Sequence, residues 1–143
     1  MNAHETNAVF RVLDANLNRL REALRVLEEY FRFIAPQPPV AEQLKKLRHD
    51  LEELELGFGP QRLLSGRDTD SDPFANLNRP EEMDRATICG VVAANFKRSQ
   101  EAARVIEEYS KITDVPFLSE KAKTMRFSLY TVEKQMRKIA VHG

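Results

Sequence analysis

The sequence of 143 residues contains one cysteine, 5 glycines and 7 prolines. A single cysteine, Cys89, excludes a disulfide within the chain and a zinc cluster built from cysteines. We expect it to pack inertly within a helix. The scarcity of helix-breaking residues, with 42% hydrophobic and 31% charged residues, indicates a helix-rich globular chain rather than a disordered or fibrous one. The length fits a single domain spanning residues 1–143.

An excess of charge of one sign is also missing. Lysine and arginine together number 22, as do aspartate and glutamate, so no net field recruits nucleic acid or an anionic membrane. Any phosphate site must therefore be local. The N-terminus has neither the basic segment nor the apolar run of a signal peptide, and no stretch approaches a membrane span. The expected location is the cytoplasm.

The chain contains an internal repeat. Residues 16–30 and 95–109 are identical at nine of fifteen positions, and the identities include asparagine, arginine and glutamate. A weaker similarity relates residues 44–51 to 122–129. The difference in residue number between equivalent positions is 79 in the first pair of segments and 78 in the second. The repeated unit is therefore predicted to be a helical hairpin.

Apolar residues recur at steps of three and four, which predicts helices. We expect them over about 6–35, 39–56, 80–112 and from about 119 onward. Gly57 is the expected C-cap of the second helix, and Pro80 the expected start of the third. Together they predict an all-α helical bundle built from two duplicated hairpins with pseudo-two-fold symmetry. Repeat one covers about 6–56, a connecting loop about 57–79, and repeat two about 80–141.

The second long helix carries smaller residues than the first on its apolar stripe. Ser99, Ala103 and Ser110 stand where the first helix has larger residues. Small residues permit a closer approach of neighbouring helices. We therefore expect the second long helix to be the more central one.

Each long helix also repeats a polar face. Asn16 and Arg19 in the first copy, and Asn95 and Arg98 in the second, lie one helical turn apart and point the same way. Asparagine offers a donor and an acceptor, and arginine a two-pronged cationic donor, so each pair could hold a planar base or an anionic oxygen. The alternative is that these arginines form ion pairs that join helices.

The segment from Ser65 to Pro73 has no second copy and concentrates Arg67, Thr69 and three aspartates. That mixture suits a nucleotide phosphate with its magnesium ion. Solvated turn residues are the alternative. The segment lacks the glycine and glutamate of a calcium loop, and the chain has no common phosphate loop or dinucleotide fingerprint.

Several motifs, in order along the chain, resemble one known family. They are LDANLNRxRExLRVxEE at 13–29, Leu47-Arg48, RDTxxDP at 67–73, Ala94-Asn95-Phe96, AxRVxEEY at 102–109 and MRxxxY at 125–130. They are similar to the monofunctional hydroxymethylpyrimidine-phosphate kinase of thiamine biosynthesis, which also occurs as the N-terminal domain fused to thiamine-phosphate synthase. The resemblance runs from about Phe10 to Glu133.

The resemblance implies transfer of a phosphoryl group from ATP, with magnesium, to hydroxymethylpyrimidine phosphate. The product would be the diphosphate that thiamine-phosphate synthase consumes. Because this chain ends at Gly143, we expect the synthase barrel to be absent, since such a barrel takes about 250 residues.

Phosphoryl transfer mainly demands positioning and charge neutralisation, and our site assignments follow from that demand. Arg19 and Arg98, near the pseudo-axis, would hold phosphates, while Asn16 and Asn95 would read the pyrimidine or adenine edge. Magnesium would be carried by Glu22, Glu101 or Asp68. Asp72 is the leading candidate base, with Asp68 as its alternative, and Arg67 and Thr69 would face phosphate oxygens. Arg48 and Arg126 would also face phosphate or, equally, form ion pairs between helices.

Two other classes of function remain open. One is an all-α nucleotide hydrolase that holds magnesium between acids of neighbouring helices. The other is a non-catalytic partner or regulatory module of thiamine-phosphate synthase. The sequence leaves the oligomeric state open, with a homo-oligomer as one alternative.

Overall fold

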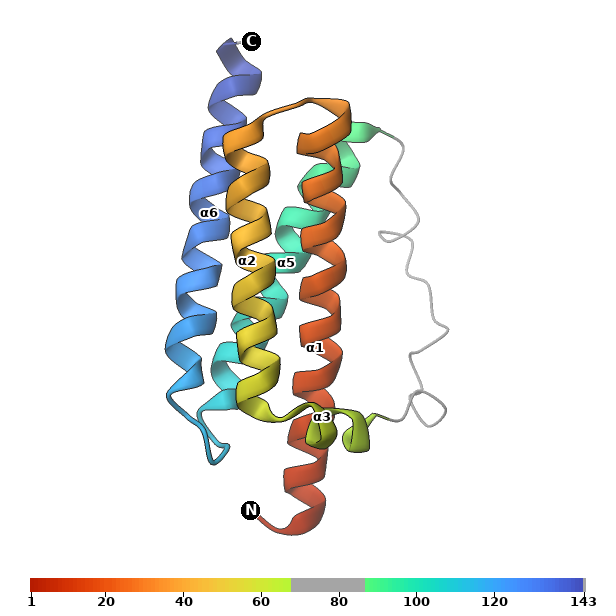
Figure 1. Cartoon of the computed structure of the whole chain (residues 1–143), viewed down its shortest axis with the longest axis vertical. Coiled ribbons are helices and arrows are strands. Elements are labelled where there is room, and N and C mark those ends of the chain that lie inside the picture. The colour runs from red at the N-terminus through yellow and green to blue at the C-terminus, as the bar shows by residue number, and fades with distance from the viewer. Residues whose placement is uncertain (68–86, 143) are drawn as a thin grey trace.

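The computed structural model describes residues 1–67 and 87–142, and every regular element in this part is helical (Figure 1). The elements are α1 (Ala3–Glu29), a π-helix η1 (Tyr30–Ile34) that continues it, α2 (Pro38–Phe58), α3 (Pro60–Gly66), α5 (Ile88–Ser110) and α6 (Leu118–His142). The predicted all-α class is confirmed. None of the described helices is long and apolar enough to cross a membrane.

The four long helices form a ring in which each lies against two others. α1 packs against α2 and α5, and α6 packs against the same two helices from the other side. α1 and α6 run in one direction and α2 and α5 in the opposite one, so ring neighbours are antiparallel (Figure 1). Fully buried apolar side chains from all four helices fill the centre, among them Leu24, Leu54, Ile106 and Leu129.

The bundle has two ends, which we name by the short helices found there. The α3 end holds the N-terminus and α3, and the η1 end holds η1, the start of α5 and the last turns of α6 (Figure 1). α3 packs against α1 and α2, and η1 packs against the same two helices.

The close packing expected of α5 is present at its interface with α1. That interface is the most extensive in the described part of the bundle. Ser99, Ala103 and Ser110 are fully buried, with the two serine hydroxyls bonded to carbonyls of their own helix at 2.8 and 3.0 Å. Among the described elements α1 contacts α2, α3 and α5, whereas α5 contacts α1 and α6. Within this part of the chain α1 is the helix with more neighbours, contrary to the expectation that α5 is the more central one.

The end of α2 lies beyond the predicted position. Gly57 is not the cap, because it sits inside the helix against α6, where a β-carbon would lie 2.8 Å from Cδ1 of Leu118. The chain leaves the helix at Gly59, whose φ of 98° is the left-handed value that glycine adopts without a steric penalty. Pro60 then starts α3, within the stretch that was predicted to be a connecting loop.

Gly59→Ala should lower the free energy of unfolding by about 1–2 kcal/mol, because the β-carbon strains a backbone with positive φ. Urea unfolding of both proteins measures this difference. Leu56→Ala is the matched control: Leu56 is 70% exposed on the same helix, so its replacement should change stability by no more than about 0.5 kcal/mol. Equal losses in the two variants would contradict the strain at Gly59.

The second half of the chain also departs from the predicted boundaries. The predicted helix start at Pro80 lies outside the described residues. The prediction of one continuous helix from about 80 to 112 is wrong, because a helix begins anew after Thr87. The backbone of Thr87 is extended, and its hydroxyl accepts the N–H of Gly90 at 2.9 Å, so Thr87 caps α5. Cys89 lies in the first turn that follows and is exposed, so the expected inert packing is wrong as well.

Candidate functional site

The repeated asparagines occupy the same local setting in both long helices. Asn16 donates its Nδ2–H to the carbonyl of Val12 at 2.9 Å, and Asn95 donates to the carbonyl of Val91 at 2.8 Å. Each bond uses one of two amide N–H groups, so each side chain keeps a second donor. Asn16 also accepts a long hydrogen bond of 3.4 Å from Arg19.

The two asparagine–arginine pairs do not meet. Phe31 of α1 contacts Phe96 of α5, with ring centroids 6.4 Å apart, which fixes the register of these antiparallel helices. At about 1.5 Å per residue, Asn16 and Asn95 lie about 24 Å apart along the bundle, and the Arg19 and Arg98 backbones about 15 Å apart. The two pairs therefore form two separate places rather than one shared site at the pseudo-axis.

Arg48 and Arg126 both lie in ion pairs between helices. Arg48 donates to Glu28 through Nε at 2.5 Å and Nη2 at 2.9 Å, and Arg126 donates to Glu107 at 3.0 and 3.3 Å. Glu28 and Glu107 are buried. The bond to Glu28 raises the pKa of Arg48 above its ordinary value, against the opposing effect of desolvation. The ion-pair alternative is confirmed for both arginines, and their guanidinium groups are already occupied by carboxylates.

Arg67 is fixed to α1. It donates from Nε and Nη2 to the two carboxylate oxygens of Asp14, both at 2.8 Å, and this raises the pKa of Arg67. Asp14 is buried and precedes Arg19 by five residues, which places the two side chains about 140° apart around α1. Arg67 therefore lies on a different face from the polar pair. Asp68, Thr69 and Asp72 lie outside the described residues.

Arg67 and Asp14 border a small pocket of about 260 Å³ between α1, α2 and α3. Arg21 and Glu55 form an ion pair beside it, and Arg21 also donates to Asn18. The polar groups named here are paired with one another. This pocket therefore offers a ligand few open hydrogen-bonding partners.

The predicted metal ligands are not gathered in the part of the chain that the structure describes. Glu22 and Glu101 are exposed on different helices. No three His, Cys, Asp or Glu side chains of residues 1–67 and 87–142 come close enough together to hold a metal ion. Magnesium binding by Glu22, Glu101 or Asp68 stays a prediction.

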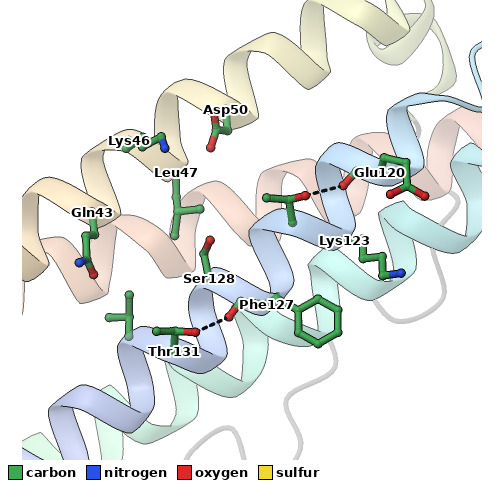
Figure 2. Close-up of a pocket in the computed structure, with 11 residues that line it drawn as sticks. Gln43, Lys46, Leu47, Asp50, Glu120, Lys123, Phe127, Ser128 and Thr131 are labelled. Carbon is green, nitrogen blue, oxygen red and sulfur yellow. Dashed lines mark hydrogen bonds between the residues drawn. The ribbon is translucent and has the colours of Figure 1, made fainter.

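A cleft of about 590 Å³ opens between α2 and α6 (Figure 2). Leu47 and Ser128 face one another across it. The hydroxyls of Thr124 and Thr131 are bonded to carbonyls of their own helix at 3.0 and 3.1 Å. Its charged groups balance in sign, being Lys46, Lys123, Asp50 and Glu120, so the cleft has no evident preference for an anion. No site was predicted here from the sequence, although Leu47 belongs to one of the family motifs.

A third pocket, of about 470 Å³, lies at the η1 end, and we call it the η1 pocket. Its lining is mostly apolar and comes from three places in the chain: Tyr30, Phe31, Ala35 and Gln37; Cys89, Val92 and Ala93; and Glu133, Met136 and Arg137. Glu133 accepts hydrogen bonds from Gln100 at 3.1 Å and from Arg137 at 3.5 Å. A concave apolar site with a few polar groups at its rim is the usual form of a small-molecule site.

One of the two polar pairs follows the α5 residues that line the η1 pocket. Asn95 follows Val92 by three residues, one helical turn, and Arg98 lies one turn further on. Asn16 and Arg19 lie toward the opposite end of the bundle. Both copies of the polar set therefore have a pocket within a few residues on the same helix: the η1 pocket on α5, and the smaller pocket of about 260 Å³ that Leu17 and Asn18 line on α1.

Comparison with known proteins finds a match to the model of the ThiD2 family over residues 11–135. A thiamine-phosphate synthase of Thermosynechococcus vestitus is 44% identical over 134 residues, which are 94% of this chain and 37% of that protein. A thiamine-phosphate synthase of Nostoc punctiforme is 42% identical over 128 residues, covering 90% of this chain and 35% of its own length. A thiamine-phosphate synthase of Rhodopirellula baltica is 36% identical over 132 residues, which are 92% of this chain and 35% of that protein. The chain therefore spans about a third of the length of these relatives. No solved structure matches it.

Proposed function

Because the chain belongs to the ThiD2 family, we propose that it makes hydroxymethylpyrimidine diphosphate by transferring a phosphoryl group from ATP to hydroxymethylpyrimidine phosphate. The relatives it matches are named thiamine-phosphate synthase, which supports a role in thiamine biosynthesis. The kinase reaction itself is our inference from the resemblance of the motifs.

One observation carries this proposal. The chain aligns along at least nine tenths of its length with proteins named thiamine-phosphate synthase, but it equals only about a third of theirs. Those proteins therefore hold this domain together with about twice as much other chain. A domain that prepares the pyrimidine diphosphate would suit a protein whose other part consumes it.

The second polar pair is our choice for binding the phosphates. Arg98 and Asn95 lie within two turns of the η1 pocket, and phosphoryl transfer needs positioning and charge neutralisation more than covalent chemistry. Asp72, Asp68 and Thr69 remain proposed as base, metal ligand and phosphate contact. Arg67, held by Asp14, would fix the start of the segment that contains them.

Magnesium would arrive bound to ATP. The ion keeps several water molecules and needs only one or two protein carboxylates beside the phosphates, so a dedicated three-acid site is not required. Glu101, one turn beyond Arg98, and Asp68 are the proposed carboxylates.

The test is to incubate the pure chain with ATP, magnesium and hydroxymethylpyrimidine phosphate and to follow phosphorus NMR. Diphosphate formed in equal amount with ADP supports the proposal. ADP and phosphate released without the pyrimidine would indicate a nucleotide hydrolase. Tight ligand binding without any product would favour the remaining alternative, a non-catalytic module of the synthase, which the names of the relatives make the second candidate.

Hydroxymethylpyrimidine that lacks its phosphate should be a poor substrate. An arginine that holds the existing phosphate supplies binding energy that the free alcohol cannot use, so its kcat/KM should be at least about tenfold lower. Initial rates with the two compounds under the same ATP concentration measure the ratio. Equal rates would contradict recognition of the substrate phosphate.

A further inference from the structure

The two ends of the bundle can be compared residue by residue, because α5 follows α1 at an offset of 79 and α6 follows α2 at 78. At both ends a glutamate of one helix pairs with a polar side chain of its neighbour. Glu55 pairs with Arg21 at the α3 end, and the equivalent Glu133 pairs with Gln100 at the η1 end. The polar contacts between neighbouring helices are therefore alike at the two ends.

The filling of the two ends differs. At the α3 end, Phe10 and Phe58 pack edge to face with centroids 6.5 Å apart, and they are 4% and 0% exposed. The residues equivalent to these two rings at the η1 end are Cys89 and Met136. Both line the η1 pocket, and Cys89 is exposed. The pocket thus occupies the place where the first repeat has two aromatic rings.

We propose that the η1 pocket binds a flat aminopyrimidine ring in that place. Phe31, Val92 and Met136 supply apolar and aromatic surface for the faces of such a ring. A volume of about 470 Å³ is ample for one heteroaromatic ring with its substituents.

Glu133 gives the pocket its chemical preference. Its carboxylate accepts bonds from Gln100 and Arg137, and a carboxylate has about four acceptor positions in all. The remaining positions suit the exocyclic amine of an aminopyrimidine. Gln37 adds an amide at the rim, with both a donor and an acceptor for ring nitrogens.

Arg98 lies five residues beyond Ala93, about 7.5 Å along α5 and about 140° around it, so its side chain is on a different face of the helix from the pocket lining. The cation that lines the pocket itself is Arg137. This assignment of the ligand rests on the proposed function. The aminopyrimidine unit occurs in hydroxymethylpyrimidine phosphate and also in the adenine of ATP, and the two must be distinguished by experiment.

Cys89 provides a direct test, because it is the single cysteine of the chain and lines the pocket. The rate of its reaction with a thiol reagent such as DTNB is measured with hydroxymethylpyrimidine phosphate, with ATP, or with inorganic pyrophosphate. We expect at least a tenfold slower reaction with one of the two aromatic ligands, and the more protective one is the occupant. An unchanged rate with both, or equal protection by pyrophosphate, would overturn the proposal.

Cys89→Phe restores the ring that the first repeat has at this place. We expect this variant to lose binding of the more protective ligand. Calorimetry measures that binding without relying on modification of Cys89. Cys89→Ser should bind the ligand normally. Lys46→Ala in the α2/α6 cleft is the matched control at another pocket and should bind normally too. Normal binding by a folded Cys89→Phe variant, or loss of binding by Lys46→Ala alone, would overturn the assignment.

The outcome also separates this inference from the proposed function. If diphosphate forms but Cys89 is never protected, the pocket assignment fails and the kinase proposal stands. If Cys89 is protected but no diphosphate forms, the pocket assignment stands and the kinase proposal fails.

Discussion

Arg98→Ala is expected to lower kcat/KM for diphosphate formation by about 100- to 1,000-fold, the usual effect of removing one donor that stabilises charge in a transition state. Arg19→Ala, at the equivalent position of the first repeat, should lower it only a few-fold. The reason is the surroundings of the two arginines. Arg98 is on the helix that lines the η1 pocket, although on another face of it, whereas at the α3 end the place equivalent to that pocket is filled by Phe10 and Phe58.

Thermal unfolding of both variants provides the control. Both arginines are exposed, so neither replacement should change the melting temperature by much. Equal losses of activity in the two variants would mean that both copies of the polar set take part. Activity and melting temperature that fall together would instead point to ion pairing as the role of these arginines.

Arg48→Ala should destabilise the fold strongly, by about 3 kcal/mol, because it leaves the buried carboxylate of Glu28 without the partner that neutralises it. Arg126→Ala at the equivalent place should cost less. There Glu107 also lies 3.3 Å from Arg104, which can keep the carboxylate paired. Urea unfolding of the two variants measures both free energies.

Replacing both members of the first pair tests the reason for that loss. Arg48→Met combined with Glu28→Leu removes the charge as well as its partner, so most of the lost stability should return. A double variant as unstable as Arg48→Ala would show that packing of the arginine side chain, rather than an unpaired charge, is responsible.

The helices could be predicted because their buried faces repeat at helical spacing over long stretches. Their ends could not, because each depends on one contact that the sequence does not reveal. Leu118 packs against Gly57, which lies within α2, and the hydroxyl of Thr87 caps the N-terminus of α5. The link to thiamine biosynthesis was also predicted from the motifs, and the family match confirms it at that level.

The site was only partly predictable. The repeated asparagines and arginines were visible as a pattern, but their separation follows from the antiparallel pairing of α1 with α5, which moves equivalent positions to opposite sides of the centre. The η1 pocket was missed because it arises where Cys89 and Met136 stand in place of the two aromatic rings of the α3 end. Comparing Cys89 with Phe10 would have indicated it, but that pair lies outside the stretch of strong identity.

The π-helix η1 explains why the offset between the repeats falls from 79 to 78. Its carbonyl at Tyr30 accepts the N–H of Ala35, five residues later, so this turn contains one residue more than an α-helical turn. The first repeat thus has one residue more between its two helices than the second repeat. The π-helical turn accommodates this residue and continues α1 without interruption. The wider turn carries Tyr30 and Phe31, two walls of the η1 pocket. The additional residue in this turn therefore contributes to the difference between the two ends of the bundle.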